Sequence, residues 1–179
     1  MMMKLCQFLF SLFTLLVLES FQSHENEEKR IFELLSDLEK IEYVSDTPIK
    51  WSDYGFTNYQ KLNHENIVNF DRKEFELDLL FDEKQKAELD QKVQSDKPIK
   101  IQKKDLPANA TLVTKDYGQL RRTVFSFSQP IFQEGKVGTK YAFILVSQTF
   151  ESEGTTKYFF LQKNDGKWKI RGMQIIGFS

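Results

Sequence analysis

The segment Tyr141-Ala142-Phe143-Ile144-Leu145-Val146-Ser147-Gln148-Thr149-Phe150 decides the fold of this chain. Successive side chains of a strand point to opposite faces, and here both sets are apolar. One face carries Tyr141, Phe143 and Leu145, and the other carries Ala142, Ile144, Val146 and Phe150. A strand that is apolar on both sides is central in its sheet and covered on both faces. We expect one cover to come from helices earlier in the chain, and the other from loops, a curled sheet or a partner.

The residues that follow predict an antiparallel hairpin. Asn164-Asp165-Gly166 separates predicted strands at 157–163 and 168–176, and these three residue types tolerate the positive φ of a tight turn. In the second strand Lys169 and Arg171 alternate with Trp168 and Ile170, which indicates one wet and one buried face. Further strands are predicted at 99–102, 110–114 and 120–128.

The front of the chain changes to helical periodicity. An apolar stripe at helical spacing predicts an amphipathic helix at 25–42, and it consists of Ile31, Leu34, Leu35, Leu38 and Ile41. A second helical region is predicted at 66–93, with Phe75, Leu79 and Leu80 as the apolar positions of its first half. Asp82 is expected to restart this region as an N-cap, with Gln85 completing a capping box.

This order of elements predicts one α+β domain over residues 24–179, in which N-terminal helices pack on a curved antiparallel β-sheet. The chain of 179 residues shows neither an internal repeat nor a linker that would separate a second domain.

Residues 1–23 have the anatomy of a secretory signal peptide. Lys4 precedes an apolar run over 5–18, the small residues Ser20 and Ser23 follow, and charged residues begin after them. The run is shorter than the roughly 20 residues that span a bilayer. We therefore expect a secreted or periplasmic protein with no membrane contact after cleavage. The alternative is an uncleaved N-terminal anchor that tethers the domain to a membrane.

Composition argues against several kinds of site. Cys6 is the only cysteine and would leave with the leader, so the mature chain would lack a disulfide and a thiolate ligand. The two histidines, His24 and His64, form no zinc-binding spacing, and we expect neither a metal nor a cofactor. A formal net charge of −1 lacks the basic excess of nucleic-acid-binding proteins.

Catalytic patterns are missing from the sequence as well, including the phosphate-binding loop and the glycine-flanked serine of esterases. The leading expectation is an exported non-catalytic domain that works by binding or assembly, with an unknown protein or small molecule as partner. One alternative is a small hydrolase or isomerase in which Asp53 or Asp116 is a general base with a raised pKa. The other is a protein inhibitor or immunity-type partner with a large exposed aromatic patch.

Five aromatic residues are candidates for ligand binding. Trp51, Tyr54 and Tyr59 lie in an irregular stretch, where flat rings either stack on a ligand or fix the loop to the core. Tyr141 and Phe143 share the face of the central strand that a curled sheet would turn into a pocket wall.

The last third of the chain resembles known families. The segment Phe127-Ser128-Gln129-Pro130-Ile131-Phe132, the long strand after it and the Asp165-Gly166-Lys167-Trp168 turn resemble the ending of secreted bacterial proteins of the Bacteroidetes type. The turn is also similar to that of nuclear transport factor 2-like domains. The resemblance implies a curved sheet that wraps around helices and forms a pocket, but no specific function.

Overall fold

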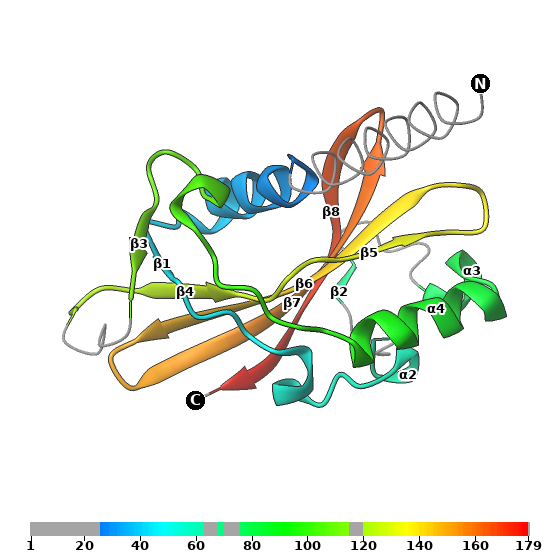
Figure 1. Cartoon of the computed structure of the whole chain (residues 1–179), viewed down its shortest axis with the longest axis horizontal. Coiled ribbons are helices and arrows are strands. Elements are labelled where there is room, and N and C mark those ends of the chain that lie inside the picture. The colour runs from blue at the N-terminus through cyan, green and yellow to red at the C-terminus, as the bar shows by residue number, and fades with distance from the viewer. Residues whose placement is uncertain (1–25, 63–67, 70–75, 115–119, 179) are drawn as a thin grey trace, which may run out of the picture.

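The computed structural model describes residues 26–62, 68–69, 76–114 and 120–178. A twisted sheet lies between two covering layers (Figure 1). One cover is the N-terminal helix, residues 26–39, and the other consists of short helices and irregular chain from residue 46 onward. Among the described residues, no helix has the length and apolar character needed to cross a membrane.

The sheet has eight strands in the order β2-β8-β7-β6-β4-β1-β3, with β5 also paired to β6. Their bounds are β1 (Tyr43–Ser45), β2 (Val68–Asn69), β3 (Thr111–Val113), β4 (Val124–Phe127), β5 (Ile131–Glu134), β6 (Lys140–Phe150), β7 (Glu153–Asn164) and β8 (Lys167–Phe178). The prediction of a purely antiparallel sheet is wrong at one edge, because β1 pairs parallel with both β3 and β4. Parallel neighbours require a long crossover, and the chain between β1 and β3 supplies it by building the second covering layer.

The prediction for the central strand is confirmed on both faces. Ala142, Ile144 and Val146 of β6 belong to a core that also contains Ile31 and Leu35 of the N-terminal helix. Tyr141, Phe143 and Leu145 belong to a second core on the opposite face. Phe150 at the strand end is 46 % exposed and joins neither core. The chain before β6 therefore supplies both covers.

The second cover is the aromatic stretch together with the helices after it. Their bounds are η1 (Trp51–Tyr54), α2 (Tyr59–Leu62), α3 (Leu77–Leu80) and α4 (Glu83–Gln94), with the 3₁₀ turn η2 (Lys103–Asp105) beyond them. Trp51 is fully buried, and its ring centroid lies 6.1 Å from that of Tyr158 on β7. The indole Nε1 donates a hydrogen bond of 3.2 Å to the carbonyl oxygen of Gln129. The loop thus spans the sheet by burying its rings on it.

The N-terminal helix is confirmed but ends earlier than predicted. Lys40 has a φ of 52°, and the Ile41 amide donates to the Ser36 carbonyl at 3.1 Å. A left-handed residue followed by this bond is a Schellman motif, which stops a helix. Leu38 is 52 % exposed and lies outside the buried stripe.

The second helical region is shorter than predicted. A helical region was predicted at 66–93. From residue 66 onward in that region, the described residues form a strand, β2, at Val68–Asn69, and helices at Leu77–Leu80 and Glu83–Gln94. Phe75 lies outside the described residues. The capping box is confirmed: the Gln85 amide donates to Asp82 Oδ1 at 2.8 Å, and the Asp82 amide donates to Gln85 Oε1 at 3.0 Å.

The strand predicted at 99–102 is absent, because the Ile101 amide bonds the Asp46 carbonyl and the chain then enters η2. Sequence periodicity also missed β1 and β5, which have only three and four residues. The hairpin between β7 and β8 is confirmed. Asp165 and Gly166 have φ values of 50° and 75°, as a two-residue turn between tightly paired strands requires.

Candidate binding pocket

A cavity of about 210 Å³ lies where the β5–β6 hairpin meets the start of the N-terminal helix and the end of α4. We call it the β5 pocket, and its lining side chains are Glu27, Lys92, Phe132, Gln133, Glu134, Lys140, Tyr141 and Trp168. A larger hollow of about 480 Å³ near α2 is lined mainly by polar groups that bind one another, such as Lys86 and Asp78 at 2.7 Å. The β5 pocket instead combines aromatic walls with charged side chains.

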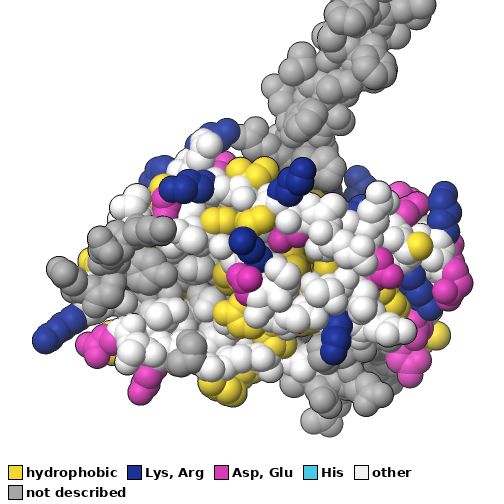
Figure 2. Space-filling view, turned by 60° about the horizontal axis from the view of Figure 1, so that its bottom comes forward, with side chains coloured by type: hydrophobic (Ala, Val, Ile, Leu, Met, Phe, Trp, Pro, Cys, Tyr) yellow, Lys and Arg dark blue, Asp and Glu magenta, His cyan; other side chains and the backbone are white. Residues whose placement is uncertain are grey.

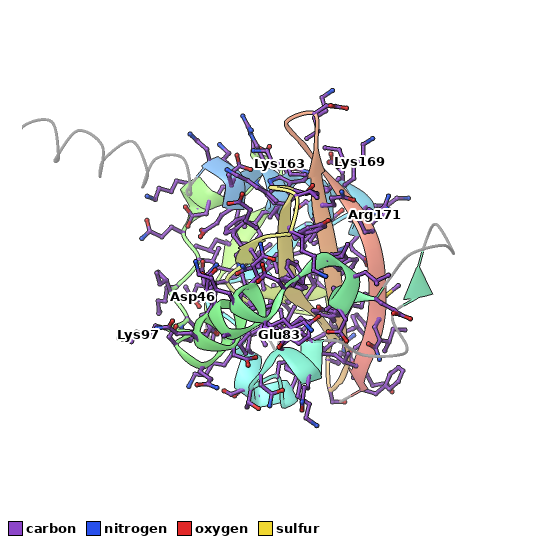
Figure 3. All side chains as sticks on the ribbon, turned by 90° about the vertical axis from the view of Figure 1, so that its right-hand side faces the viewer. Asp46, Glu83, Lys97, Lys163, Lys169 and Arg171 are labelled. Carbon is purple, nitrogen blue, oxygen red and sulfur yellow. The ribbon has the colours of Figure 1, made fainter. Side chains whose placement is uncertain are left out.

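Glu27 lines the pocket and accepts two short hydrogen bonds. Lys163 Nζ lies 2.6 Å from Glu27 Oε1, and Trp168 Nε1 lies 2.6 Å from Glu27 Oε2. Figure 3 shows Lys163 near the N-terminal helix, with Lys169 and Arg171 along β8. Burial by itself raises the pKa of Glu27, but the bonds from Lys163 and Trp168 outweigh it and leave that pKa lowered. Glu27 is thus an ionised carboxylate whose two oxygens are both occupied.

Phe132 and Trp168 form the aromatic wall. Their ring centroids are 5.8 Å apart with an interplanar angle of 46°, within the range of favourable aromatic pairs. Trp168 is 7 % exposed, and its Nε1 is fixed by Glu27, so the indole has one orientation. Phe132 is only half-buried and therefore leaves part of its ring open to the cavity.

Lys92 of α4 reaches the edge strand β5. Its Nζ donates to the Phe132 carbonyl at 2.8 Å and to Gln133 Oε1 at 2.7 Å. Burial of the ammonium group lowers the pKa of Lys92, although the charge of Glu88 partly opposes the effect. A lysine ammonium has three N–H donors, so one remains for a ligand after these two bonds.

Glu134 and Lys140 are opposite each other on β5 and β6. Both are exposed, and residues directly opposite in an antiparallel pair lie on the same face of the sheet. The neighbouring pair is Gln133 with Tyr141. Burial raises the pKa of Tyr141 despite the Thr139 hydrogen bond and the Arg171 charge, so its phenol stays protonated and can donate.

The structure separates the five residues that the sequence singled out for ligand binding. Tyr141 lines the β5 pocket, whereas Tyr59 lines the polar hollow near α2, where its hydroxyl donates to Asp78 Oδ1 at 3.0 Å. Trp51 and Phe143 are fully buried in the core. Tyr54 is 37 % exposed and accepts a 2.8 Å hydrogen bond from Thr156 Oγ1. A ligand contact at these five residues stays a prediction, and only Tyr141 lies at the pocket.

Of the two carboxylates considered as general bases, the structure describes only Asp53, which is not among the lining residues of the β5 pocket. Asp53 is exposed on η1, and Asp116 lies outside the described residues. Asp96 does have a raised pKa, caused first by burial and then by the charge of Asp53, against the hydrogen bond that it accepts from the Trp51 amide. Asp96 lines neither the β5 pocket nor the polar hollow near α2.

Most of the pocket was not predicted from the sequence. Glu27 lies in the first turn of one helix, Lys92 lies in the last turn of another, and Phe132 lies on a strand of four residues. These positions are far apart in the sequence, so no sequence motif contains them. Tyr141 is the lining residue that the sequence did single out, and Trp168 was a further available signal, because an inward-facing tryptophan directly after a hairpin turn marks the end of the core. Among the described residues, no group of three or more acidic, histidine or cysteine side chains could hold a metal ion.

Comparison with known proteins adds no relative. No family model matches this chain, and neither the curated proteins nor the solved structures contain a match.

Proposed function

We propose that this protein is an exported, non-catalytic domain that binds a small ligand in the β5 pocket. The observation that carries the proposal is the pairing of a fixed aromatic wall, Phe132 and Trp168, with the partly buried ammonium group of Lys92. Ligand pockets typically combine apolar walls with a few oriented polar groups. Here the wall supplies contact area, and Lys92 supplies a donor in a fixed position.

The size of the cavity limits the ligand to about one ring. An engineered apolar cavity of about 150 Å³ accepts benzene, and the β5 pocket has about 210 Å³. A single ring with a short polar substituent would fill it. Sugars of several units or peptides of several residues would extend into solvent.

Export is part of the proposal and rests on the leader predicted at residues 1–23, which lie outside the described residues. A membrane-tethered form with an uncleaved leader is the alternative. On the face drawn in Figure 2, positive and negative side chains are interspersed over the described residues, which agrees with the near-zero net charge and a partner other than nucleic acid.

We also propose that the fold is of the nuclear transport factor 2-like type. The pairing of β7 with β8 is irregular between Thr156 and Lys157 and between Phe160 and Leu161. Such irregularities bend a sheet. A bent sheet with helices on its inner side and a pocket at one end would suit that fold.

The chain provides its own control for a binding experiment, because it has two tryptophans in different places. The full chain would be expressed with its leader, purified, and titrated with single-ring compounds while the two indole N–H resonances are followed by NMR. We expect the Trp168 resonance to shift in a saturable way and the buried Trp51 resonance to stay in place. The proposal fails if neither resonance moves, or if both move together. Mass spectrometry of the purified chain would show whether residues 1–23 are removed.

A further inference from the structure

We infer that the β5 pocket selects a zwitterion, namely a free amino acid with a single-ring or similarly sized apolar side chain. The inference rests on the proposed function, since it names the chemical class of the ligand for that same pocket. Some charged groups of the lining are already neutralised by neighbouring side chains, and others are not.

Glu27 is already neutralised. Its two oxygens accept bonds from Lys163 and Trp168, and the guanidinium of Arg30 lies 3.6 Å from Oε1. A ligand cation would therefore gain little from Glu27. The side chain acts instead as a positioning residue that fixes the indole of Trp168.

Three lining groups keep charge or donors available. Lys92 uses two of its three N–H groups on Phe132 and Gln133. Among the described residues, Lys140 and Glu134 have no ion-pair partner within 4.0 Å, although they are opposite each other in the strand register. The pocket lining thus offers two ammonium groups and one carboxylate.

A simple ligand ion would satisfy only part of this arrangement. A carboxylic acid would bind Lys92 or Lys140 but would bring its charge next to Glu134, and an amine would meet two like charges. Like-charge contacts of this kind are how binding sites reject the wrong partner. A free amino acid carries both charges on one carbon, so its carboxylate can bind the lysines while its ammonium group binds Glu134. Its side chain would then contact Phe132 and Trp168.

The test compares three ligands that share a ring but differ in charge: L-phenylalanine, phenylacetate and phenethylamine. The readout is the Trp168 indole resonance of the full chain, with Trp51 as the internal reference. We expect L-phenylalanine to bind at least about tenfold more tightly than either singly charged ligand, because each loses one charge-assisted contact. A blocked derivative, N-acetyl-L-phenylalaninamide, should bind no better than those two.

Variants assign the charges. In Glu134→Gln, L-phenylalanine should lose its advantage over phenylacetate. In Lys140→Met its advantage over phenethylamine should shrink to what Lys92 alone provides. Glu83→Gln and Lys84→Met are matched controls on α4 outside the pocket and should preserve the wild-type order.

Two outcomes separate the inference from the proposed function. If a singly charged or blocked ligand shifts Trp168 as effectively as L-phenylalanine, the pocket binds ligands but the zwitterion inference is wrong. If none of the four ligands shifts Trp168, the proposed function fails together with the inference.

Discussion

Glu27 and Lys163, which are separated by 136 positions in the sequence, form a contact of 2.6 Å that fixes the first turn of the N-terminal helix to β7. The other end of the helix is held in the same way, since Lys157 Nζ lies 2.5 Å from Glu39 Oε2. Twelve helical residues rise about 18 Å, and six strand residues extend about 20 Å. The two spacings match, so both ion pairs can form at once. Because the start of the helix pairs with the later lysine of β7 and its end pairs with the earlier one, the helix runs antiparallel to β7. Between the pairs, Ile31 and Leu35 face Phe159 and Leu161 in one core.

A double-mutant cycle should show that the pair of Glu27 with Lys163 contributes to stability. Glu27→Gln, Lys163→Met and the double variant would be compared by urea unfolding. We expect a coupling energy of about 1–2 kcal/mol, because both side chains are only 17 % exposed and charge-assisted bonds are stronger in partly buried sites. The control cycle uses Lys84 and Glu88, which are 3.8 Å apart and 85 % and 46 % exposed. It should give less than about 0.5 kcal/mol. Equal couplings in the two cycles would contradict the assignment.

The contribution of Glu27 should also depend on pH. Its pKa lies below the usual value of 4.5, so the folded state favours the ionised form. Stability from a lowered carboxyl pKa is present above the unfolded-state value and is lost as the pH falls through the folded-state value. The difference in unfolding free energy between the wild type and Glu27→Gln should therefore be constant near pH 7 and shrink below about pH 4.5. A difference that grew in acid would have the wrong sign for this mechanism.

Two leucines of α3 should respond very differently to the same substitution. Leu77 is fully buried, whereas Leu79 is 59 % exposed. Leu77→Ala should cost about 2–5 kcal/mol because it leaves a cavity in the second core. Leu79→Ala should change the unfolding free energy by no more than about 0.5 kcal/mol. Thermal or urea unfolding of the two variants measures both values, and a larger loss for Leu79→Ala would show that the helix faces the other way.

The turn between β7 and β8 allows a test of backbone strain alone. Gly166 has a φ of 75°, and a Cβ built on it would meet nothing within 4 Å. Gly166→Ala should therefore destabilise the protein by about 1–2 kcal/mol through the left-handed backbone and not through a clash. Asp165 has a φ of 50°, so Asp165→Gly should be close to neutral. If Gly166→Ala unfolds at the wild-type urea concentration, the turn adopts another conformation in solution.

Sequence reasoning predicted the elements whose cause is local or whose pattern is long. The two-faced strand β6, the N-terminal helix, the capping box of Asp82 and the turn at Gly166 all belong to this kind. Leu79 shows where the reasoning fails: α3 has one turn, and periodicity over four residues does not decide whether Leu77 or Leu79 faces the core.

Other features depend on contacts between distant parts of the chain. The parallel pairing of β1 with β3 joins Val44 to Leu112, and nothing near Val44 indicates it. The candidate pocket is similar, because Glu27, Lys92 and Phe132 come together only after the helix, α4 and β5 have packed on the sheet. Charge pairing across such distances leaves no spacing pattern in the sequence.

The contact at Glu27 also limits the distance between the folded body and the leader that is proposed at residues 1–23. Only three positions separate residue 23 from Glu27, and a fully extended chain spans at most about 14 Å over those four steps. A retained leader in a membrane would consequently hold Glu27, and the β5 pocket that Glu27 lines, close to the lipid headgroups and restrict how the body can turn. If the leader is removed, as proposed, that tether is lost and the pocket would be exposed to the molecules of the surrounding fluid instead.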